Sequence, residues 1–292
     1  MTTEGTAAPE QLVAVPVRHP LRWVSAVLVL VALGLLVRAF ADSDIQWPIT
    51  RHYFTFDTIV TGAGKTLLIS VVAQALGIVL GVVFAVARQS PNPVTSSVAW
   101  LYIWFFRGTP VLLQLLIWYN LALVFPTILG HQTSDIMTPF LAALLGLGIN
   151  EGAYMAEIVR AGLTSVDEGQ TEAAQALGMR RSLVLRRIVL PQAMRVIIPP
   201  TGNEFVNMLK TSSLAYSIQY SELLFAATGI ASSILAPVEL YLAAAVWYLI
   251  LTSAFSIVQY YVERHYARGS SRNLPDTPLQ KLRANLGKAP RL

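Results

Sequence analysis

An all-α integral membrane protein is the fold class that the sequence predicts, from its composition and the length of its apolar runs. Hydrophobic residues make up 54% and charged residues 13% of the 292 residues, against roughly 25% charged residues in an ordinary soluble domain. Several apolar runs also reach the roughly 20 residues that a helix needs to cross a bilayer. The net charge of +5 is too small and dispersed to indicate nucleic acid, and the absence of Cys excludes a thiolate metal site. No metal site is predicted.

About six membrane-spanning helices are predicted. The first runs from 21 to 40, and it does not resemble a cleaved signal peptide because the run is long and no small-x-small site follows at once. The second runs from 66 to 87, where Gly77 and Gly81 form a small-residue face suited to close helix packing.

The third apolar region, 94–125, is 32 residues long and too long for one straight span. It is interrupted by the sequence RGTP at 107–110, which predicts a short segment followed by a spanning helix. The remaining predicted spans are 139–163, 196–218 and 237–262.

The stretch TGAGKT at 61–66 resembles the end of a nucleotide-binding phosphate loop of the form G-x-x-x-x-G-K-[ST]. The first glycine of that pattern would fall at residue 59, which is Ile59. A phosphate loop also joins a strand to a soluble helix, whereas Thr66 begins an apolar run. The preferred interpretation is a turn of small residues at the mouth of a membrane span.

The distribution of Lys and Arg predicts that both termini are cytoplasmic. With that orientation, sixteen basic residues lie inside and three outside. The predicted divisions are a cytoplasmic tail at 1–20, an N-terminal transmembrane helix at 21–40, an extracytoplasmic loop at 41–57, a transmembrane domain at 58–263 and a basic cytoplasmic tail at 264–292. Two interpretations of the last segment stay open, a solvated tail and contact with anionic lipid headgroups.

The longest cytoplasmic loop, 165–195, predicts two helices. Ser165 or Asp167 can cap the first, and Gly178 suits its end. The second is amphipathic, and Pro191 is predicted to end it. A projecting hairpin with a small-residue face indicates docking into another protein, while packing under its own spans is the alternative.

This loop matches the pattern EAA-x3-G-x9-I-x-LP and resembles the membrane subunits of bacterial ABC importers. The matching residues are Glu172, Ala173, Ala174, Gly178, Ile188, Leu190 and Pro191. The segments FRGTPVLLQLLIWY, NEGAYMAEIVRAGLTSVDEGQTEAAQALGM and NEFVNMLKTSSLAYSI further resemble the polar amino-acid permeases of that superfamily. The resemblance covers about 58–263, so it implies the family's five-helix core with an added N-terminal span.

The resemblance implies a transport subunit of the bacterial inner membrane that is not itself an enzyme and binds no cofactor. ATP and Mg²⁺ would bind a separate dimeric ATPase, which receives the coupling helix formed by Glu172 to Gly178. Gly178 is expected there because a side chain would widen a tight turn. A second permease chain, identical or related, would complete the path, and an extracytoplasmic amino-acid-binding protein would deliver substrate. Membrane lipid is the remaining expected partner.

Polar residues inside the apolar spans are candidates for substrate binding, because charged groups in a membrane are costly. An amino acid needs acceptors for its ammonium group and donors or a cation for its carboxylate. Glu151 and Lys210 provide the two signs. The full candidate set is Arg107, Asn150, Glu151, Tyr154, Asn203, Asn207, Lys210, Thr211, Ser212 and Ser213.

Structural roles compete with some of these assignments. Three alternatives stay open for Glu151: it binds substrate, which favours basic amino acids, it neutralises Lys210, or its carboxylate takes up a proton. Arg107 is expected to bind carbonyl groups exposed at the RGTP break, with substrate binding as the alternative. Glu157 is expected to pair with Arg160.

Two other classes of protein compete with an importer subunit as interpretations of the sequence. An ion-driven secondary transporter would also carry carboxylates at mid-membrane, but internal repeats are expected there, and none is found. A membrane hydrolase is disfavoured because the sequence has no paired HExxH motif, no GxSxG motif and no aspartate pair on facing spans.

Overall fold

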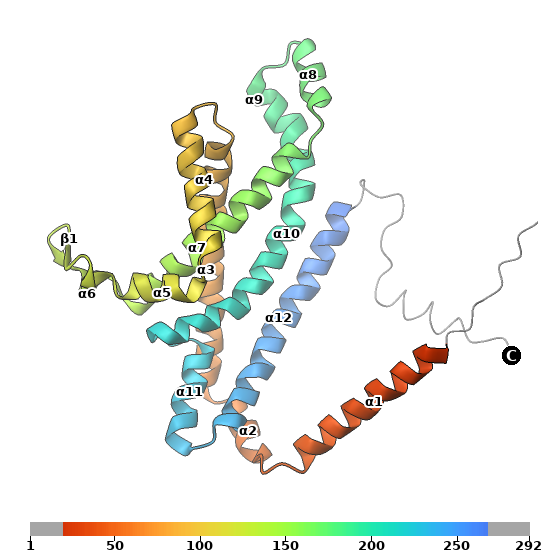
Figure 1. Cartoon of the computed structure of the whole chain (residues 1–292), viewed down its shortest axis with the longest axis vertical. Coiled ribbons are helices and arrows are strands. Elements are labelled where there is room, and N and C mark those ends of the chain that lie inside the picture. Colours follow the sequence, from red (N-terminus) through yellow and green to blue (C-terminus); the bar gives the residue numbers. More distant parts are fainter. Residues whose placement is uncertain (1–19, 268–292) are drawn as a thin grey trace, which may run out of the picture. The chain divides into compact units, whose positions relative to one another are not determined.

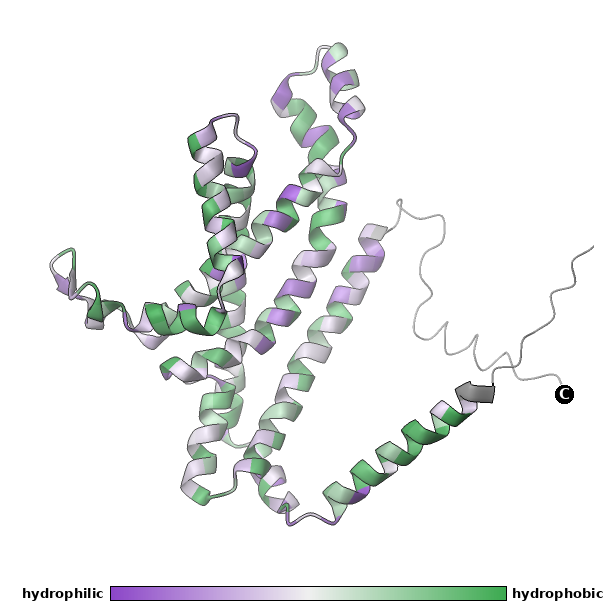
Figure 2. Cartoon of the chain, in the orientation of Figure 1, coloured by the Kyte–Doolittle hydropathy of each residue, from purple (hydrophilic) through white to green (hydrophobic). Residues whose placement is uncertain are grey.

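The computed structural model describes residues 20–267, which fall into two compact units. The first unit ends at Gln46 and contains α1 (Pro20–Ala41). From Trp23 on, every side chain of α1 is exposed, and Figure 2 colours most of its residues as hydrophobic. A helix that is apolar all round suits a lipid environment. Apart from their innermost residues, the tails predicted at 1–20 and 264–292 lie outside the described residues.

The second unit begins at Trp47 and is helical apart from one small hairpin (Figure 1). Its elements are α2 (Trp47–Phe54), α3 (Asp57–Arg88), α4 (Pro93–Gly108), α5 (Val111–Tyr119), the 3-10 helix Leu121–Leu123, β1 (Thr127–Ile128), β2 (His131–Gln132), α6 (Thr133–Ile136), α7 (Pro139–Thr164), α8 (Glu168–Ala176), α9 (Arg181–Val184), the π-helix Leu185–Val189, α10 (Leu190–Thr211), the 3-10 helix Ser212–Ile218, α11 (Leu223–Ile234) and α12 (Pro237–Ala267).

The hydrophobic core follows α3. Near its start, Ile59 packs with α11 and α12. In the middle, Ile69 packs with α5, α7 and the 3-10 helix after α10. Near its end, Ala85 packs with α7 and the beginning of α10. Because α3 contributes to all three clusters, it is the central element of this unit.

Glycines allow α3 and α7 to approach closely, as the predicted small-residue face requires. A Cβ on Gly77 would lie 2.5 Å from Cγ of Glu151, and a Cβ on Gly148 would lie 2.7 Å from Cδ2 of Leu76. Gly81 faces Met155 in the same way. Contacts this short leave no space for a side chain, so the glycines fix the spacing of the two helices.

The interpretation of TGAGKT as a turn is wrong, because the whole stretch lies inside α3. Its small residues serve packing, since a Cβ on Gly62 would lie 3.0 Å from Cβ of Ala226. The polar residues hold the entry to α11. Lys65 donates a hydrogen bond of 2.7 Å to Ser221, and Thr66 donates one of 3.2 Å to Glu222.

The break in the third apolar region is present, but its two parts come in the opposite order to the prediction. The 16-residue α4 precedes the break and the 9-residue α5 follows it, at an angle of 103°. Thr109 is extended at φ −113°, ψ 143°, as a residue before a proline prefers to be. The helix therefore ends just before Pro110, and the chain changes direction there.

After α5 the chain forms a small β-hairpin with two residues in each strand, which was not predicted from the sequence. Thr127 pairs with Gln132 and Ile128 with His131 in antiparallel register. Leu129 and Gly130 have φ values of 51° and 81°, as the central residues of a type I′ turn require. The turn has the sequence Ile-Leu-Gly-His, with Leu129 where such turns usually have Asn, Asp or Gly, so the sequence contains little indication of it.

Three helices within residues 20–267 are long and apolar enough to cross a membrane, or four if the bent pair α4 and α5 counts as one span. α7 and α10 are 26 and 22 residues long, but charged residues interrupt their apolar character (Figure 2). The total of six spans therefore stays a prediction. The fifth predicted span, 196–218, begins earlier than expected, at Leu190, and becomes a 3-10 helix at Ser212.

The prediction that Pro191 ends a helix is also wrong. The chain stays helical from Arg181 through Thr211, and Pro191 occupies the first turn of α10. A proline inside a continuous helix removes one backbone hydrogen bond, and a local π-helical adjustment beside it can accommodate that loss. The π-helical turn Leu185–Val189 comes directly before it, and the N–H of Leu190 bonds to the carbonyl of Leu185.

Candidate functional site

Two side chains hold the break between α4 and α5. Nε2 of Gln114 donates to the carbonyls of Phe106 and Thr109, both at 3.1 Å, and to the hydroxyl of Thr109 at 2.8 Å. Nδ2 of Asn150 also donates to the carbonyl of Phe106, at 2.7 Å. These amides satisfy the carbonyls that Arg107 was expected to bind, so that expectation for Arg107 is wrong.

A polar cavity of about 640 Å³ lies between this break, α7 and α10. It contains seven of the ten residues predicted to bind substrate: Arg107, Asn150, Glu151, Tyr154, Asn207, Lys210 and Thr211. Arg107 lies in the last turn of α4, just before the break. The other six residues lie on α7 and α10. The volume falls in the range of small-molecule sites, about 300–1,000 Å³.

Both signs of charge line this cavity. Glu151 is only 5% exposed, and its Oε1 accepts a hydrogen bond of 3.2 Å from Gln74 of α3. The guanidinium carbon of Arg107 lies 5.3 Å from the ring centre of Tyr154, within cation–π range. Lys210 and Glu204 lie in the same cavity on α10.

The charged groups of the cavity do not neutralise one another directly. Among residues 20–267, ion pairs within 4.0 Å join Arg38 to Asp42 and Arg160 to Glu157, and none joins residues of the cavity. The Arg160–Glu157 pair was expected, and its atoms are 2.7 Å apart. The alternative in which Glu151 neutralises Lys210 has no ion pair to support it. The cavity thus offers separate acidic and basic groups.

Glu204 is the cavity residue that the sequence analysis missed. It precedes Asn207 by three residues and Thr211 by seven, and these spacings place all three on one face of a helix. A search of α10 for polar residues three or seven positions before the candidates Asn207 and Thr211 could have found it. The cavity therefore has two carboxylates rather than one.

Three predicted substrate-binding residues do not line the cavity. Asn203 donates to Glu263 of α12 at 3.3 Å. The hydroxyls of Ser212 and Ser213 donate to the carbonyls of Leu209 and Lys210 at 3.0 and 2.7 Å. These two bonds satisfy carbonyls at the end of α10, so the serines have structural partners.

The predicted coupling segment, Glu172 to Gly178, covers the second half of α8 and the two residues after it, at the end of the molecule where α7 leads into α9 (Figure 1). Asp167 caps α8 by accepting a hydrogen bond of 2.7 Å from the N–H of Gly169. Ala174 is buried, while Glu172 and Ala173 are exposed and Leu177 is 84% exposed. The open face of α8 is therefore available to another molecule.

Gly178 follows α8 with φ of +78°, a conformation that favours glycine over residues with a Cβ. No heavy atom lies within 4 Å of the position that its Cβ would occupy. The expected steric reason for this glycine is therefore wrong within this chain, and backbone conformation is the reason that the structure supports.

Similarity to known proteins agrees with this arrangement. A family model described as "Binding-protein-dependent transport system inner membrane component" matches residues 77–268. The arginine transport system permease protein ArgU of Corynebacterium glutamicum is 47% identical over 286 residues, covering 95% of this chain and 90% of that protein. The probable amino-acid permease protein YxeN of Bacillus subtilis is 41% identical over 210 residues, covering 72% and 91%.

Among solved structures, a chain from the crystal structure of an amino acid ABC transporter with histidines is similar, with a TM-score of 0.68 at 34% identity. The match covers 76% of this chain and 100% of that one. The part left unmatched is consistent in size with α1 and the two termini, which the sequence analysis assigned outside the resembling region.

Proposed function

This chain belongs to the family of binding-protein-dependent transport system inner membrane components, and we propose that it forms the membrane path of an ATP-driven importer of polar amino acids, with basic amino acids as preferred substrates. Members of this family are transport subunits and not enzymes. The observation that carries the proposal is the cavity between the α4–α5 break, α7 and α10, which holds carboxylates and cations without direct ion pairs between them.

The charges of the cavity match a basic amino acid. Such a substrate carries two cationic groups and one carboxylate. Glu151 and Glu204 offer an acceptor for each cation, and Lys210 offers a cation for the carboxylate. Arg107, which lies over the ring of Tyr154, supplies a second donor for that carboxylate. The name of the 47% identical relative, an arginine permease, supports the same substrate class.

Force for transport enters through α8. A separate ATPase dimer, which binds ATP and Mg²⁺, receives the exposed face formed by Glu172, Ala173 and Leu177. The motif residues Leu190 and Pro191 begin α10, which leads from this contact to the cavity. Movement of α8 would thus be transmitted along α10 to Glu204 and Lys210.

The remaining parts of the assembly follow from the same family. A second permease chain completes the path, an extracytoplasmic amino-acid-binding protein delivers substrate to the opposite end, and both termini lie in the cytoplasm of a bacterium. The excess of Lys and Arg at the end that carries α8 supports this orientation.

Uptake by the reconstituted complex tests the proposal. Vesicles containing this permease, its ATPase and its binding protein should accumulate labelled arginine only when ATP is enclosed with the ATPase. Unlabelled lysine should compete better than glutamate. Accumulation driven by a sodium or proton gradient without the ATPase would instead identify an ion-driven transporter.

A further inference from the structure

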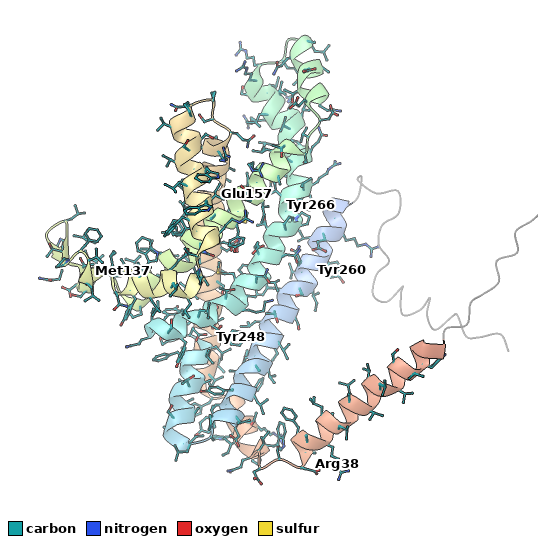
Figure 3. All side chains as sticks on the ribbon, viewed as in Figure 1. Arg38, Met137, Glu157, Tyr248, Tyr260 and Tyr266 are labelled. Atoms are coloured by element: carbon teal, nitrogen blue, oxygen red, sulfur yellow. The ribbon has the colours of Figure 1, made fainter. Side chains whose placement is uncertain are left out.

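A second cavity, of about 540 Å³, lies at the end of the molecule that carries α8. It is formed by the loop between α7 and α8, the beginning of α10 and the end of α12. Ser165 and Val166, which line it, directly precede α8. Figure 3 shows Tyr260 and Tyr266 along this part of α12, and both line the cavity. Neither the substrate path nor the coupling contact uses this space.

The cavity has basic groups that are available to an anion. Arg195 and Arg264 both line it, and within residues 20–267 neither forms an ion pair within 4.0 Å. Among the described residues, Arg264 donates one side-chain hydrogen bond, to the hydroxyl of Tyr260 at 3.4 Å. The nearby carboxylate of Glu263 accepts hydrogen bonds from Gln259 at 2.9 Å and Asn203 at 3.3 Å. Both bonds end on Oε1 of Glu263, so the cavity holds two guanidinium groups and one carboxylate, an excess of one positive charge.

The cavity also has acceptors and an apolar wall. Pro199 and Pro200 lack the N–H groups that would bond the carbonyls of Arg195 and Val196 in a regular helix. Those carbonyls can accept hydrogen bonds from a ligand hydroxyl. The side chains of Val166, Val196 and Pro199 form an apolar surface beside them. A ligand that fits must combine an anion, hydroxyl donors and hydrocarbon.

We propose that this cavity binds the headgroup of an anionic phospholipid of the phosphatidylglycerol type. Arg195 and Arg264 bind the phosphodiester, for which guanidinium forks are well shaped. The glycerol hydroxyls donate hydrogen bonds to the carbonyls of Arg195 and Val196. The acyl chains extend along the apolar surface beside them. Basic pockets between transmembrane helices at the cytoplasmic surface are a recurrent form of lipid site, and tyrosines are enriched at that depth.

The basic C-terminal segment is a poorer occupant for this cavity. Residues 268–292 contain six Lys or Arg and one Asp, so their charge opposes binding next to Arg195 and Arg264. The same charge attracts anionic headgroups to this surface. Charge complementarity therefore favours lipid.

Lipid in this position would stabilise the base of the coupling hairpin. The cavity joins the residues that precede α8 to the first turn of α10 and to α12. A bound headgroup bridges Arg195 of α10 and Arg264 of α12, so it holds the two helices together where α8 transmits force. The inference goes beyond substrate transport and does not depend on which amino acid is carried.

Native mass spectrometry of the purified transporter complex tests the proposal. Phosphatidylglycerol and phosphatidylcholine with the same acyl chains are titrated into wild type and into the double variant Arg195→Gln/Arg264→Gln. Wild type should bind phosphatidylglycerol more tightly than phosphatidylcholine, because phosphatidylcholine carries the same phosphodiester but replaces the glycerol hydroxyls with an ammonium that the two guanidinium groups repel. The double variant should bind phosphatidylglycerol at least about tenfold more weakly than wild type and lose the preference, since one charge-assisted hydrogen bond is worth a factor of about ten or more. The control Arg186→Gln/Arg187→Gln removes the same charge from exposed positions of the π-helical turn and should keep the preference.

Four results would overturn the proposal. They are equal binding of the two lipids by wild type, an unchanged affinity for phosphatidylglycerol in Arg195→Gln/Arg264→Gln, displacement of phosphatidylglycerol by millimolar inorganic phosphate alone, and a large gain in lipid binding when the chain ends at Ala267. The third result would identify a site for free phosphate, and the fourth would identify the C-terminal segment as the occupant. If the double variant does not assemble, the comparison of the two lipids on wild type still decides.

Discussion

Nε2 of Gln74 in α3 donates a hydrogen bond of 3.2 Å to Oε1 of Glu151 in α7, so the buried carboxylate at the cavity has a neutral amide as its hydrogen-bond partner. The contact exists because α3 and α7 pack unusually closely. Gly77, three residues after Gln74, lies against the side chain of Glu151. Helix packing and the chemistry of the cavity therefore depend on the same few residues.

Gly77→Ala should destabilise the protein and disturb the cavity. Its Cβ would lie 2.5 Å from Cγ and 2.8 Å from Cβ of Glu151, and overpacking of this kind costs about 1–3 kcal/mol. The matched control is Gly64→Ala on the same helix, where no heavy atom lies within 4 Å of the new Cβ. We expect a lower melting temperature for Gly77→Ala and an equal or higher one for Gly64→Ala. Equal melting temperatures for both variants would show that α3 and α7 are not packed as described.

Each substitution of Gly178 should reduce transport in proportion to the free energy that the new residue needs to adopt a positive φ. Ala or Val at φ of +78° costs on the order of 1–2 kcal/mol, whereas Asn visits this region more readily. Uptake should therefore fall least in Gly178→Asn, more in Gly178→Ala and most in Gly178→Val, with unchanged membrane insertion. If Asn and Val reduce uptake equally, while the ATPase still copurifies, side-chain volume at the partner surface is the controlling factor.

A chain that begins near Asp44 should lose membrane insertion or expression before it loses substrate preference. None of the residues 20–46 lines the cavity, and the family match begins at residue 77. Expression level and the ranking of competing amino acids in uptake check this prediction. Normal insertion combined with an altered ranking would place α1 in the transport path.

The sequence predicted those features that depend on local patterns. Apolar run length located the helices, and Pro110 marked the break, because both signals are contained in neighbouring residues. The start of α3 was missed because TGAGKT is polar and glycine-rich, and only its contacts with Ser221 and Glu222 explain why it is helical.

The orientation of α10 about its own axis, which decides which of its faces meets the cavity, could not be predicted in the same way. Asn203 and Asn207 are four residues apart, yet Asn203 faces α12 and Asn207 lines the cavity. Gln259 of α12 lies against Gly202 and donates a hydrogen bond of 2.6 Å to the carbonyl of Pro199. This tertiary contact helps to decide which face of α10 meets the cavity, and it joins residues 60 positions apart.

The central claim is that the carboxylates of the cavity recognise the cationic groups of a basic amino acid, and Glu151→Gln tests it most directly. The variant keeps the shape of the side chain and removes its charge. Its new amide can donate to Oε1 of Gln74, a buried atom without a hydrogen-bond partner in residues 20–267, so the melting temperature should stay the same or rise slightly. Glu204→Gln, on the facing helix, is the companion variant.

The deciding measurement is uptake of arginine and glutamine by Glu151→Gln in vesicles with the ATPase and binding protein, beside its melting temperature. Arginine uptake should fall about tenfold or more, as the loss of one charge-assisted hydrogen bond implies, while glutamine uptake changes much less. Equal losses for both substrates with a lowered melting temperature would contradict the account and assign Glu151 to the stability of the α3–α7 contact instead.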